Sequence, residues 1–337
     1  PKTPARGFRT RPHRAGCDGS SPAKNKAIAG MVIVLLLVPV FIEDPYIMNI
    51  IILSLLFAVL ASSWNLICGY TGIFTFGHQA FFGIGAYVSS LLAMKAGLSP
   101  WLGLFAGGIA AALIGLMIGL PCLRLRIAPY IAITTMAFSE IARIVCMNLV
   151  GLTRGELGLW GIPEFPEIAL PGGWVVNFAG GERTGYYYVI LAIFFATLIL
   201  IGLMLRSYIG LGFRAIRDEQ DAALSLGIDI TRYKLLVFIT SSFFAGVAGA
   251  FYAHYILILT PTSVMSVGVM TEIIAVTLVG GLGTFWGPVI GAFSLTALLE
   301  YLREFGEYRF MIYGAILVAT IMFMPKGVSS KIFPEKE

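Results

Sequence analysis

The chain has 337 residues, a length that would allow two soluble domains of ordinary size. Its composition excludes them, because 58% of the residues are apolar, 12% are charged and the mean hydropathy is +0.88. Soluble domains carry roughly 25% charged residues, so soluble, disordered and disulfide-stapled secreted classes are excluded together. The apolar runs are unbroken, whereas the strands of a membrane β-barrel alternate. We therefore expect an all-α, polytopic transmembrane helical bundle.

Residues 1–26 are polar and hold seven Lys or Arg, which predicts a disordered, basic cytoplasmic tail. The apolar run 28–42 follows, and we interpret it as a retained first helix. A cleaved signal peptide is the alternative, but no small-x-small cleavage motif precedes Glu43. Nine later runs mostly approach the ~20 residues of a membrane-crossing helix. They are 46–68, 80–96, 99–121, 129–150, 186–205, 234–258, 271–283, 288–302 and 309–324, and the runs at 271 and 288 are short enough to be broken or re-entrant helices.

The positions of the basic residues predict the topology. With the N-terminus inside, the expected inner segments hold 17 Lys and Arg and the outer segments hold 5. This bias follows the positive-inside rule, so we expect about ten helices with both termini cytoplasmic, a membrane domain over 27–326 and an inner tail over 327–337. The net charge of +5 then fits a membrane protein, and no nucleic-acid partner is expected. The four cysteines form no C-x-x-C pair, and we expect no cofactor, metal or disulfide.

Two loops are long enough to carry a function. The outer loop, 151–185, is rich in Gly and Pro and holds four carboxylates. The inner loop, 206–233, contains a stretch from Phe213 to Leu226 that has the composition of a helix, with Gly227 placed to end it. A short amphipathic helix of this kind suits docking into a groove on a soluble partner. An interfacial helix that lies on lipid headgroups is the alternative.

The inner loop reads Arg214-Ala-Ile-Arg217-Asp218-Glu219, followed by Ala222-Ala223 and Gly227-Ile228. This segment is similar to the coupling loop of permease subunits of branched-chain amino-acid ABC importers, and within them to the longer, LivM-type subunit. The likeness covers about residues 46–326. Its other parts are Gly69 to Tyr87, Leu123 to Arg126, Tyr130 to Ile141, Leu152 to Pro163 and Gly280 to Ala292.

The resemblance implies a transport subunit of the bacterial inner membrane that works with other proteins. These are a second, homologous permease, two cytoplasmic ATPases and a periplasmic substrate-binding protein, which would land on the outer loop. The chain has no G-x-x-x-x-G-K-[ST] phosphate-binding loop, so we expect it not to be an enzyme and to be energised by the other subunits. The residues expected to contact the ATPases are Arg214, Arg217, Asp218, Glu219, Ala222, Ala223 and Gly227.

Polar residues and glycines within the spans are candidates for the solute pathway or its gate. Glu140 and Arg143 share a helix face, and ionisable groups at membrane depth indicate function by default; a structural ion pair is the alternative. A G-x-x-G-x-F spacing occurs at Gly69 and again at Gly280. Interrupted helices of this kind indicate a substrate path, with plain close packing as the alternative. The full set of candidates is Glu140, Arg143, Asn65, Gly72, Gly77, His78, Gln79, Gly283 and Gly287, where His78 can also be a helix cap or core residue and Asn65 an interhelical hydrogen bond.

Three functions fit these features. The first is a permease subunit of an ABC importer for branched-chain amino acids, although related permeases carry urea or short amides and nothing in this chain distinguishes leucine from urea. The second is a stand-alone carrier driven by an ion gradient, against which the coupling-loop motif argues. The third is a membrane-embedded enzyme, which is disfavoured because the sequence contains no nucleophile–base or metal constellation.

Overall fold

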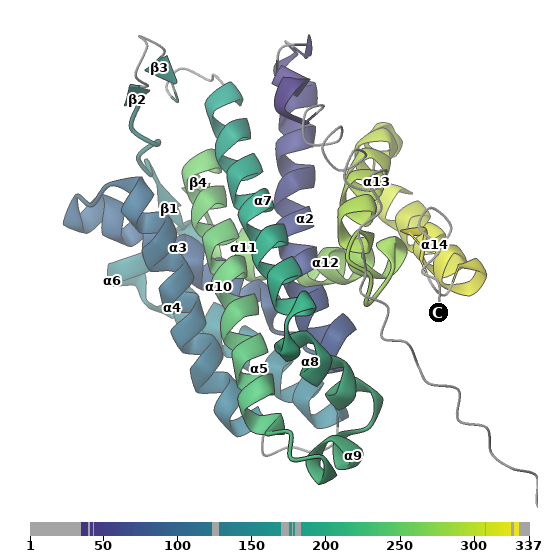
Figure 1. Ribbon diagram of the computed structural model, residues 1–337. Helices are drawn as coiled ribbons and strands as arrows, with labels where there is room; N and C mark the ends of the chain where they lie inside the picture. The colour runs from purple at the N-terminus through teal and green to yellow at the C-terminus, as the bar shows by residue number, and fades with distance from the viewer. Residues whose placement is uncertain are drawn as a thin grey trace, which may run out of the picture. The chain divides into compact units, whose positions relative to one another are not determined.

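The computed structural model describes residues 35–39, 41–42, 44–122, 128–169, 175–176, 178, 183–306, 308–324 and 327–329. Helices make up most of this part of the chain (Figure 1). The long ones are α2 (Pro45–Thr71), α3 (His78–Ala96), α4 (Pro100–Cys122), α5 (Ala128–Asn148), α7 (Arg183–Arg206), α10 (Ile230–Ile256), α12 (Val267–Gly280), α13 (Gly287–Tyr301) and α14 (Tyr308–Phe323). The short ones are α6 (Val150–Thr153), η1 (Gly155–Leu157), α8 (Tyr208–Asp218), α9 (Gln220–Ser225), α11 (Pro261–Met265) and η2 (Leu302–Phe305).

Two small antiparallel sheets lie in the connections. The strand β1 (Leu159–Trp160) pairs with β4 (Ile258–Leu259), and β2 (Ile168–Ala169) pairs with β3 (Val175–Val176). Residues from Asp44 onward form one compact unit, to which the description below applies. The first pairing ties the expected outer loop to the residues that follow α10.

Six of the described helical segments are long and apolar enough to cross a membrane. This confirms the all-α membrane bundle, while ten helices and cytoplasmic termini stay predictions. The expected first span 28–42 and the tails 1–26 and 327–337 lie largely outside the described residues. The short run at 271–283 belongs to a longer span, Pro261–Gly280, in which extended backbone at Ser266 separates α11 from α12. That span is therefore a broken helix, as its length indicated.

Helix α2 is the centre of the bundle. The Asp44 side chain accepts a hydrogen bond from the Tyr46 N–H at 2.9 Å and so caps the first turn. Gly72 ends the helix in the left-handed conformation, with φ at 71°. The most apolar stretch of α2 is 78% buried inside the chain, more than in any other of the six described spans. An element that contacts α2 can therefore transmit its own movement to the rest of the bundle.

Helices α3, α4 and α10 approach one another at glycines. A Cβ atom at Gly249 would lie 1.8 Å from the carbonyl oxygen of Phe82, and one at Gly85 would lie 2.1 Å from that of Gly246. Glycine at these positions lets the backbones touch, which is the way that membrane helices gain packing energy without a hydrophobic driving force. These three helices therefore form one tightly packed layer.

Helix α3 begins within the bundle and not at the level where α2 ends. The indole Nε1 of Trp64 donates to the Thr75 carbonyl at 3.0 Å, and Ser63 Oγ lies 2.8 Å from His78 Nε2. Ser63 is eight residues before the end of α2, so the connection 72–77 runs back about 12 Å along α2 at 1.5 Å per residue before α3 starts. The N-terminus of α3 consequently lies inside the bundle, beside Ser63 of α2.

Opposite ends of the bundle carry the two predicted loops. The strands β2 and β3 lie at the top of Figure 1, and α8 and α9 lie at the bottom. Near the first end, Phe165 packs on Trp101 with ring centroids 4.6 Å apart and on His254 at 5.2 Å. His254 is fully buried and its Nδ1 lies 2.8 Å from the Pro163 carbonyl. The aromatic rings and this histidine hold part of the 151–185 loop against α10.

Candidate functional site

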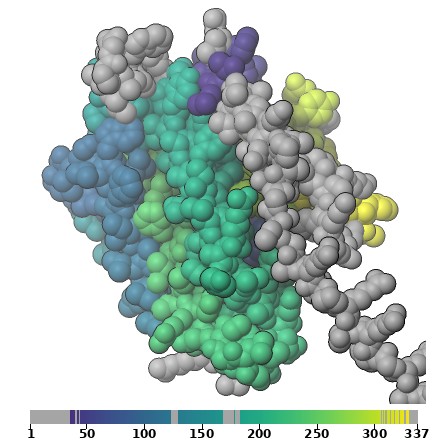
Figure 2. Space-filling model, viewed as in Figure 1, coloured from purple at the N-terminus to yellow at the C-terminus, as the bar shows by residue number. Residues whose placement is uncertain are grey.

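The inner loop 206–233 folds into α8 and α9, which join α7 to α10. Helix α8 buries Phe213 and Ile216, and Gly212 lets the ring of Tyr233 approach, because a Cβ atom there would lie 2.3 Å from its Cε1. The Ser207 side chain caps α8 by accepting from the Ile209 N–H at 3.2 Å. The opposite face is left to solvent, so this segment is amphipathic as expected. Figure 2 shows α7, α8 and α9 at the molecular surface.

The expectation of a single helix from Phe213 to Leu226 is wrong. The chain bends at Glu219, whose extended backbone (φ −157°, ψ 109°) ends α8 and starts α9. The bend carries Gln220 toward α10, where its Oε1 accepts from the Lys234 Nζ at 3.1 Å. Lys234 is 4% exposed, and a buried ammonium group needs such a partner. The bend therefore satisfies a cation that a straight helix would leave facing apolar neighbours.

The seven residues expected to contact an ATPase fall into two groups. Five are exposed without a described hydrogen bond or ion pair from their side chains: Arg214, Asp218, Glu219, Ala222 and Gly227. Gly227 adopts φ 81° just beyond α9, the left-handed position predicted for a helix end. Ala223 is 2% exposed and packs inside the chain, so its side chain is unavailable to a partner. Arg217 is also exposed, but its guanidinium is hydrogen-bonded to the Gly69 carbonyl of α2.

Arg217 joins α8 to the ends of two membrane helices. Its Nη1 donates to the Gly69 carbonyl in the last turn of α2 at 2.8 Å. A Cβ atom at Gly283 would lie 2.8 Å from the same nitrogen, and one at Gly72 would lie 3.6 Å from Arg217 Cγ. The side chain thus lies over Gly69, Gly72 and Gly283. One residue of the expected coupling set therefore contacts residues of the expected gate set.

Asn65 fastens the connection 281–286 to α2. Its Oδ1 accepts from the Gly283 N–H at 2.8 Å, and its Nδ2 donates to the Thr284 carbonyl at 2.9 Å. The amide thus satisfies two backbone groups that no helix pairs, and Asn65 itself is 2% exposed. Close packing was the alternative reading of the repeated glycines, and it is found here: a Cβ atom at Gly280 would lie 1.9 Å from the Gly287 carbonyl.

The start of α3 lies against the middle of α5. A Cβ atom at Gly77 would lie 2.8 Å from the Thr135 carbonyl, and the Gln79 Nε2 donates to Ser139 Oγ at 2.8 Å. His78 is fully buried beside Ser63, so it is a core residue of the kind that the alternative reading described. The His78 Nδ1 and Gln79 Oε1 atoms have no hydrogen-bond partner among the described residues. The structure thus brings Gly77, His78 and Gln79 to the α3–α5 contact.

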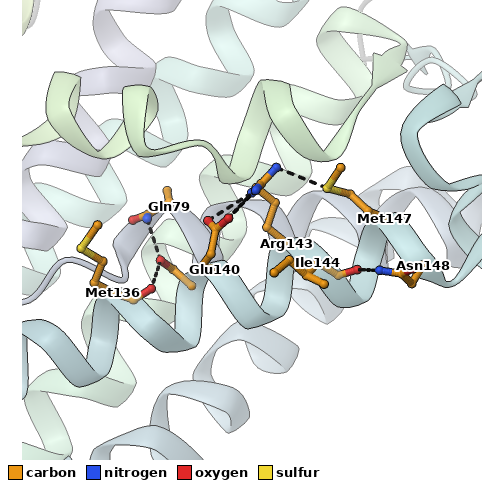
Figure 3. Close-up of polar contacts among 8 residues, drawn as sticks. Gln79, Met136, Glu140, Arg143, Ile144, Met147 and Asn148 are labelled. Carbon is orange, nitrogen blue, oxygen red and sulfur yellow. Dashed lines mark hydrogen bonds and ion pairs between the residues drawn. The ribbon is translucent and has the colours of Figure 1, made fainter.

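Glu140 and Arg143 form the ion pair that their spacing predicted. The Arg143 Nε donates to both carboxylate oxygens of Glu140 at 3.1 Å, and Nη2 donates to Oε1 (Figure 3). The Arg143 Nη1 also lies 3.3 Å from the Met147 sulfur. The side chains are 41% exposed for Glu140 and 24% for Arg143. The pair is therefore only partly covered by this chain, although its neighbours along α5 are mostly apolar.

Three contributors to these sites were not among the candidate residues, although they lie in segments that carry the family resemblance. Ser139 and Thr135 are ordinary hydroxyl residues of α5 that become notable only because α3 starts beside them. Thr284 follows the predicted glycine, and its Oγ1 accepts from the Gly287 N–H at 3.1 Å, which starts α13. Within the described residues, no group of three or more His, Cys, Asp or Glu is arranged to hold a metal ion.

Comparison with known proteins places the chain in a family. Residues 46–321 match the family described as the permease component of the branched-chain amino acid transport system. The chain belongs to this family. The high-affinity branched-chain amino acid permease LivM of Escherichia coli K12 is 31% identical over 333 residues, which cover 94% of this chain and 78% of that protein. The LivM protein of Salmonella typhimurium is 29% identical over the same shares.

The family contains a second type of permease that is also similar to this chain. The LivH permease of Salmonella typhimurium is 27% identical over 302 residues, which cover 83% of this chain and 92% of that protein. The chain is therefore similar to both types of branched-chain amino acid permease, LivM and LivH. No solved structure matches the chain.

Proposed function

We propose that this chain is the LivM-type permease subunit of an ATP-binding cassette importer of the inner membrane, and that it carries branched-chain or related amino acids. The observation that carries the proposal is the hydrogen bond from Arg217 to the Gly69 carbonyl. It connects a surface helix pair, which offers exposed charges to a soluble partner, with the end of the most buried membrane helix. A motor that moves α8 would thereby move α2 and the connection 281–286.

The proposal includes four protein partners. Two cytoplasmic ATPases would dock on the exposed residues of α8 and α9, with Arg214, Asp218 and Glu219 fixing their orientation through charge complementarity more than adding affinity. A LivH-like permease would complete the membrane part. An extracytoplasmic binding protein would land on the loop 151–185 and deliver the solute. The termini would lie in the cytoplasm, on the same side as α8 and α9.

Vesicle transport tests the proposal directly. The four kinds of subunit are reconstituted in proteoliposomes, and uptake of leucine is measured with ATP, without ATP and without the ATPases. We expect uptake only in the complete system, and only when ATP is supplied on the side of the membrane that carries the ATPases. Uptake driven by a proton or sodium gradient in the absence of the ATPases would show a secondary carrier instead. Urea, offered with its own binding protein, tests the alternative solute class.

Docking on α8 and α9 needs a separate test. Replacing Asp218 and Glu219 together by lysine reverses two exposed charges, so we expect the ATPases to be lost when the membrane part is purified through a tag. Glu304→Lys is the matched control, because Glu304 is also exposed but lies on η2. Co-purification that is equal for the double variant and the control would contradict docking at this surface.

A further inference from the structure

The described spans differ in what they leave uncovered. Helix α4 exposes a stripe of apolar side chains and carries no charged residue. Helix α7 has Arg183 and Arg206 at its two ends and apolar exposed residues between them. Helix α5 is the least buried span, with 17% of its most apolar stretch inside the chain, yet it carries the pair Glu140–Arg143 on its uncovered side. The exposed faces of α4 and α7 suit lipid, whereas that of α5 combines apolar side chains with a partly covered ion pair.

The depth of the pair follows from the residues around it. Exposed apolar side chains precede it at Tyr130 and Ile133, and others follow it at Ile144 and Val150. The other ion pairs of the described chain, Asp229–Arg232 and Glu300–Arg303, occupy helix ends instead. Charged side chains within the hydrocarbon cost several kcal/mol by most scales, and they face a protein interior or an aqueous cavity almost without exception. The Glu140–Arg143 pair is therefore expected to face another subunit or an aqueous cavity and not lipid.

We infer that Glu140 and Arg143 form a subsite for a zwitterionic solute, in which the carboxylate of Glu140 receives the solute ammonium and the guanidinium of Arg143 receives its carboxylate. This inference rests on the proposed function and specifies its solute class. In the resting chain the two side chains neutralise each other. A zwitterion replaces that single ion pair by two charge-assisted hydrogen-bonded pairs, and the pair between Arg143 and the solute carboxylate has the planar geometry that Arg and carboxylate favour. A neutral solute such as urea offers no such exchange.

Gln79 is buried at the α3–α5 contact, where it is bonded to Ser139, the residue before Glu140. The Ser139 hydroxyl donates to the Met136 carbonyl at 2.8 Å, so its oxygen must accept from the Gln79 Nε2. This fixes the orientation of the amide and leaves Oε1 as an acceptor with no partner among the described residues, in a side chain that is 1% exposed. Figure 3 shows the amide oxygen of Gln79 on the side away from the Glu140 carboxylate. Gln79 therefore holds the start of α3 against α5 beside the ion pair and is not part of the subsite.

Ligand competition on the complete transporter tests the subsite without requiring transport. The complex is held in lipid nanodiscs without its binding protein, and bound tritiated leucine is displaced by leucine, by 4-methylpentanoate, which lacks the ammonium, or by 3-methylbutylamine, which lacks the carboxylate. We expect the unmodified complex to prefer leucine to both. Glu140→Gln should weaken leucine by about tenfold, equivalent to 1.4 kcal/mol, and raise 4-methylpentanoate to the level of leucine. Arg143→Gln should do the same for 3-methylbutylamine.

The controls separate a binding role from a structural one. Glu300→Gln and Arg303→Gln break an ion pair of the same spacing at a helix end, and they should leave the order of competitors unchanged. The double variant Glu140→Arg with Arg143→Glu keeps an ion pair in which the two residues are exchanged, so it should assemble and bind leucine. It replaces the single variants in the test if these do not assemble. The inference would be overturned if both single variants kept the order of competitors of the unmodified complex. It would also be overturned if the assembled double variant or the unmodified complex did not bind leucine. Uptake that is independent of ATP would refute the proposed function but leave the order of competitors as it is.

Discussion

Arg217 of α8 donates a 2.8 Å hydrogen bond to the carbonyl oxygen of Gly69, 148 positions earlier in the chain. The carbonyl belongs to the last turn of α2, where helix carbonyls lack partners within the helix. A cation at the C-terminal end of a helix is favoured by the helix dipole as well as by the hydrogen bond. Arg217 of α8 therefore caps the C-terminal end of α2. Its hydrogen bond to Gly69 can persist only while α8 keeps its position relative to α2.

Replacing Arg217 by glutamine should uncouple ATP hydrolysis from uptake. The substitution removes a hydrogen bond from a charged donor, which contributes about 1.5–3 kcal/mol, and it leaves the other exposed charges of α8 and α9 intact. We expect the ATPases to remain bound, while the amount of solute moved per ATP falls about tenfold or more. Both quantities are measured in the same proteoliposomes.

Arg214→Gln provides the contrast, because Arg214 is exposed and makes no described side-chain contact. We expect it to weaken ATPase binding and to leave the solute moved per ATP unchanged in the complexes that remain. If Arg217→Gln releases the ATPases to the same extent as Arg214→Gln, the inward role of Arg217 is refuted.

Gly69→Ala should destabilise the protein. The added Cβ would lie 2.1 Å from Asn65 Oδ1 and 2.5 Å from the backbone nitrogen of Gly283, and a backbone atom cannot move aside as a flexible side chain can. Overpacking of this kind costs about 1–3 kcal/mol, so the Tm measured in detergent should fall. Gly314→Ala is the control, since nothing lies within 4 Å of its added Cβ and alanine favours a helix over glycine by about 0.5–1 kcal/mol. Equal Tm values for both variants would show that the contact is not tight.

Asn65→Asp should be more harmful than Asn65→Ala. The aspartate keeps the acceptor for the Gly283 N–H, but it places a carboxylate oxygen against the Thr284 carbonyl oxygen. It also buries a negative charge that forms no direct ion pair, because the Arg217 guanidinium donates to the Gly69 carbonyl. An unpaired buried charge costs more than a lost hydrogen bond. Limited proteolysis within 281–286 and the Tm report the two effects. An aspartate variant that is as stable as the alanine variant would contradict the assigned orientation of the amide.

Much of the fold could be predicted from the sequence, because long apolar runs of about 20 residues leave helices as the only spanning structure. The Glu140–Arg143 pair could also be predicted, since an i, i+3 spacing places two side chains together whatever surrounds the helix. The identity of the inner loop was accessible for a different reason, namely its resemblance to a family. Each of these features depends on residues that are neighbours along the chain.

The contacts that give the candidate site its shape join distant parts of the chain. Arg217 could be read as a charged surface residue, and only the packing of α8 on α2 turns it inward. Asn65 reaches Gly283 across 218 positions, and no local pattern selects that partner. The bend at Glu219 escaped prediction because the stretch around it favours a helix, and the need of Lys234 for Gln220 is a tertiary effect. Local propensity is overridden in such places.

The two buried histidines of the bundle should carry opposite tautomers. The Ser63 hydroxyl donates to the Leu60 carbonyl at 2.8 Å, so its oxygen accepts from His78, which must be protonated at Nε2. The Nδ1 of His254 faces the Pro163 carbonyl, which can only accept, so His254 must be protonated at Nδ1 and its Nε2 accepts from the Ser89 hydroxyl at 2.8 Å. Nitrogen-15 solid-state NMR of histidine-labelled protein distinguishes the two forms.

Substitution assigns the signals and tests the energetic role of each contact. His78→Asn and His254→Asn each remove one signal, while His13 contributes the same signal to every sample. Ser89→Ala leaves the Nε2 of His254 buried without a donor, which costs about 1–3 kcal/mol, so we expect faster proteolysis of the segment 155–165 that His254 holds through Pro163. Ser90→Ala is the matched control, because the neighbouring Ser90 hydroxyl donates only to the Ala86 carbonyl of its own helix. Finding the same tautomer at both histidines would contradict the hydrogen-bond directions given above. Equal proteolysis of the two serine variants would contradict the role of the Ser89–His254 hydrogen bond in joining α3, α10 and the outer loop.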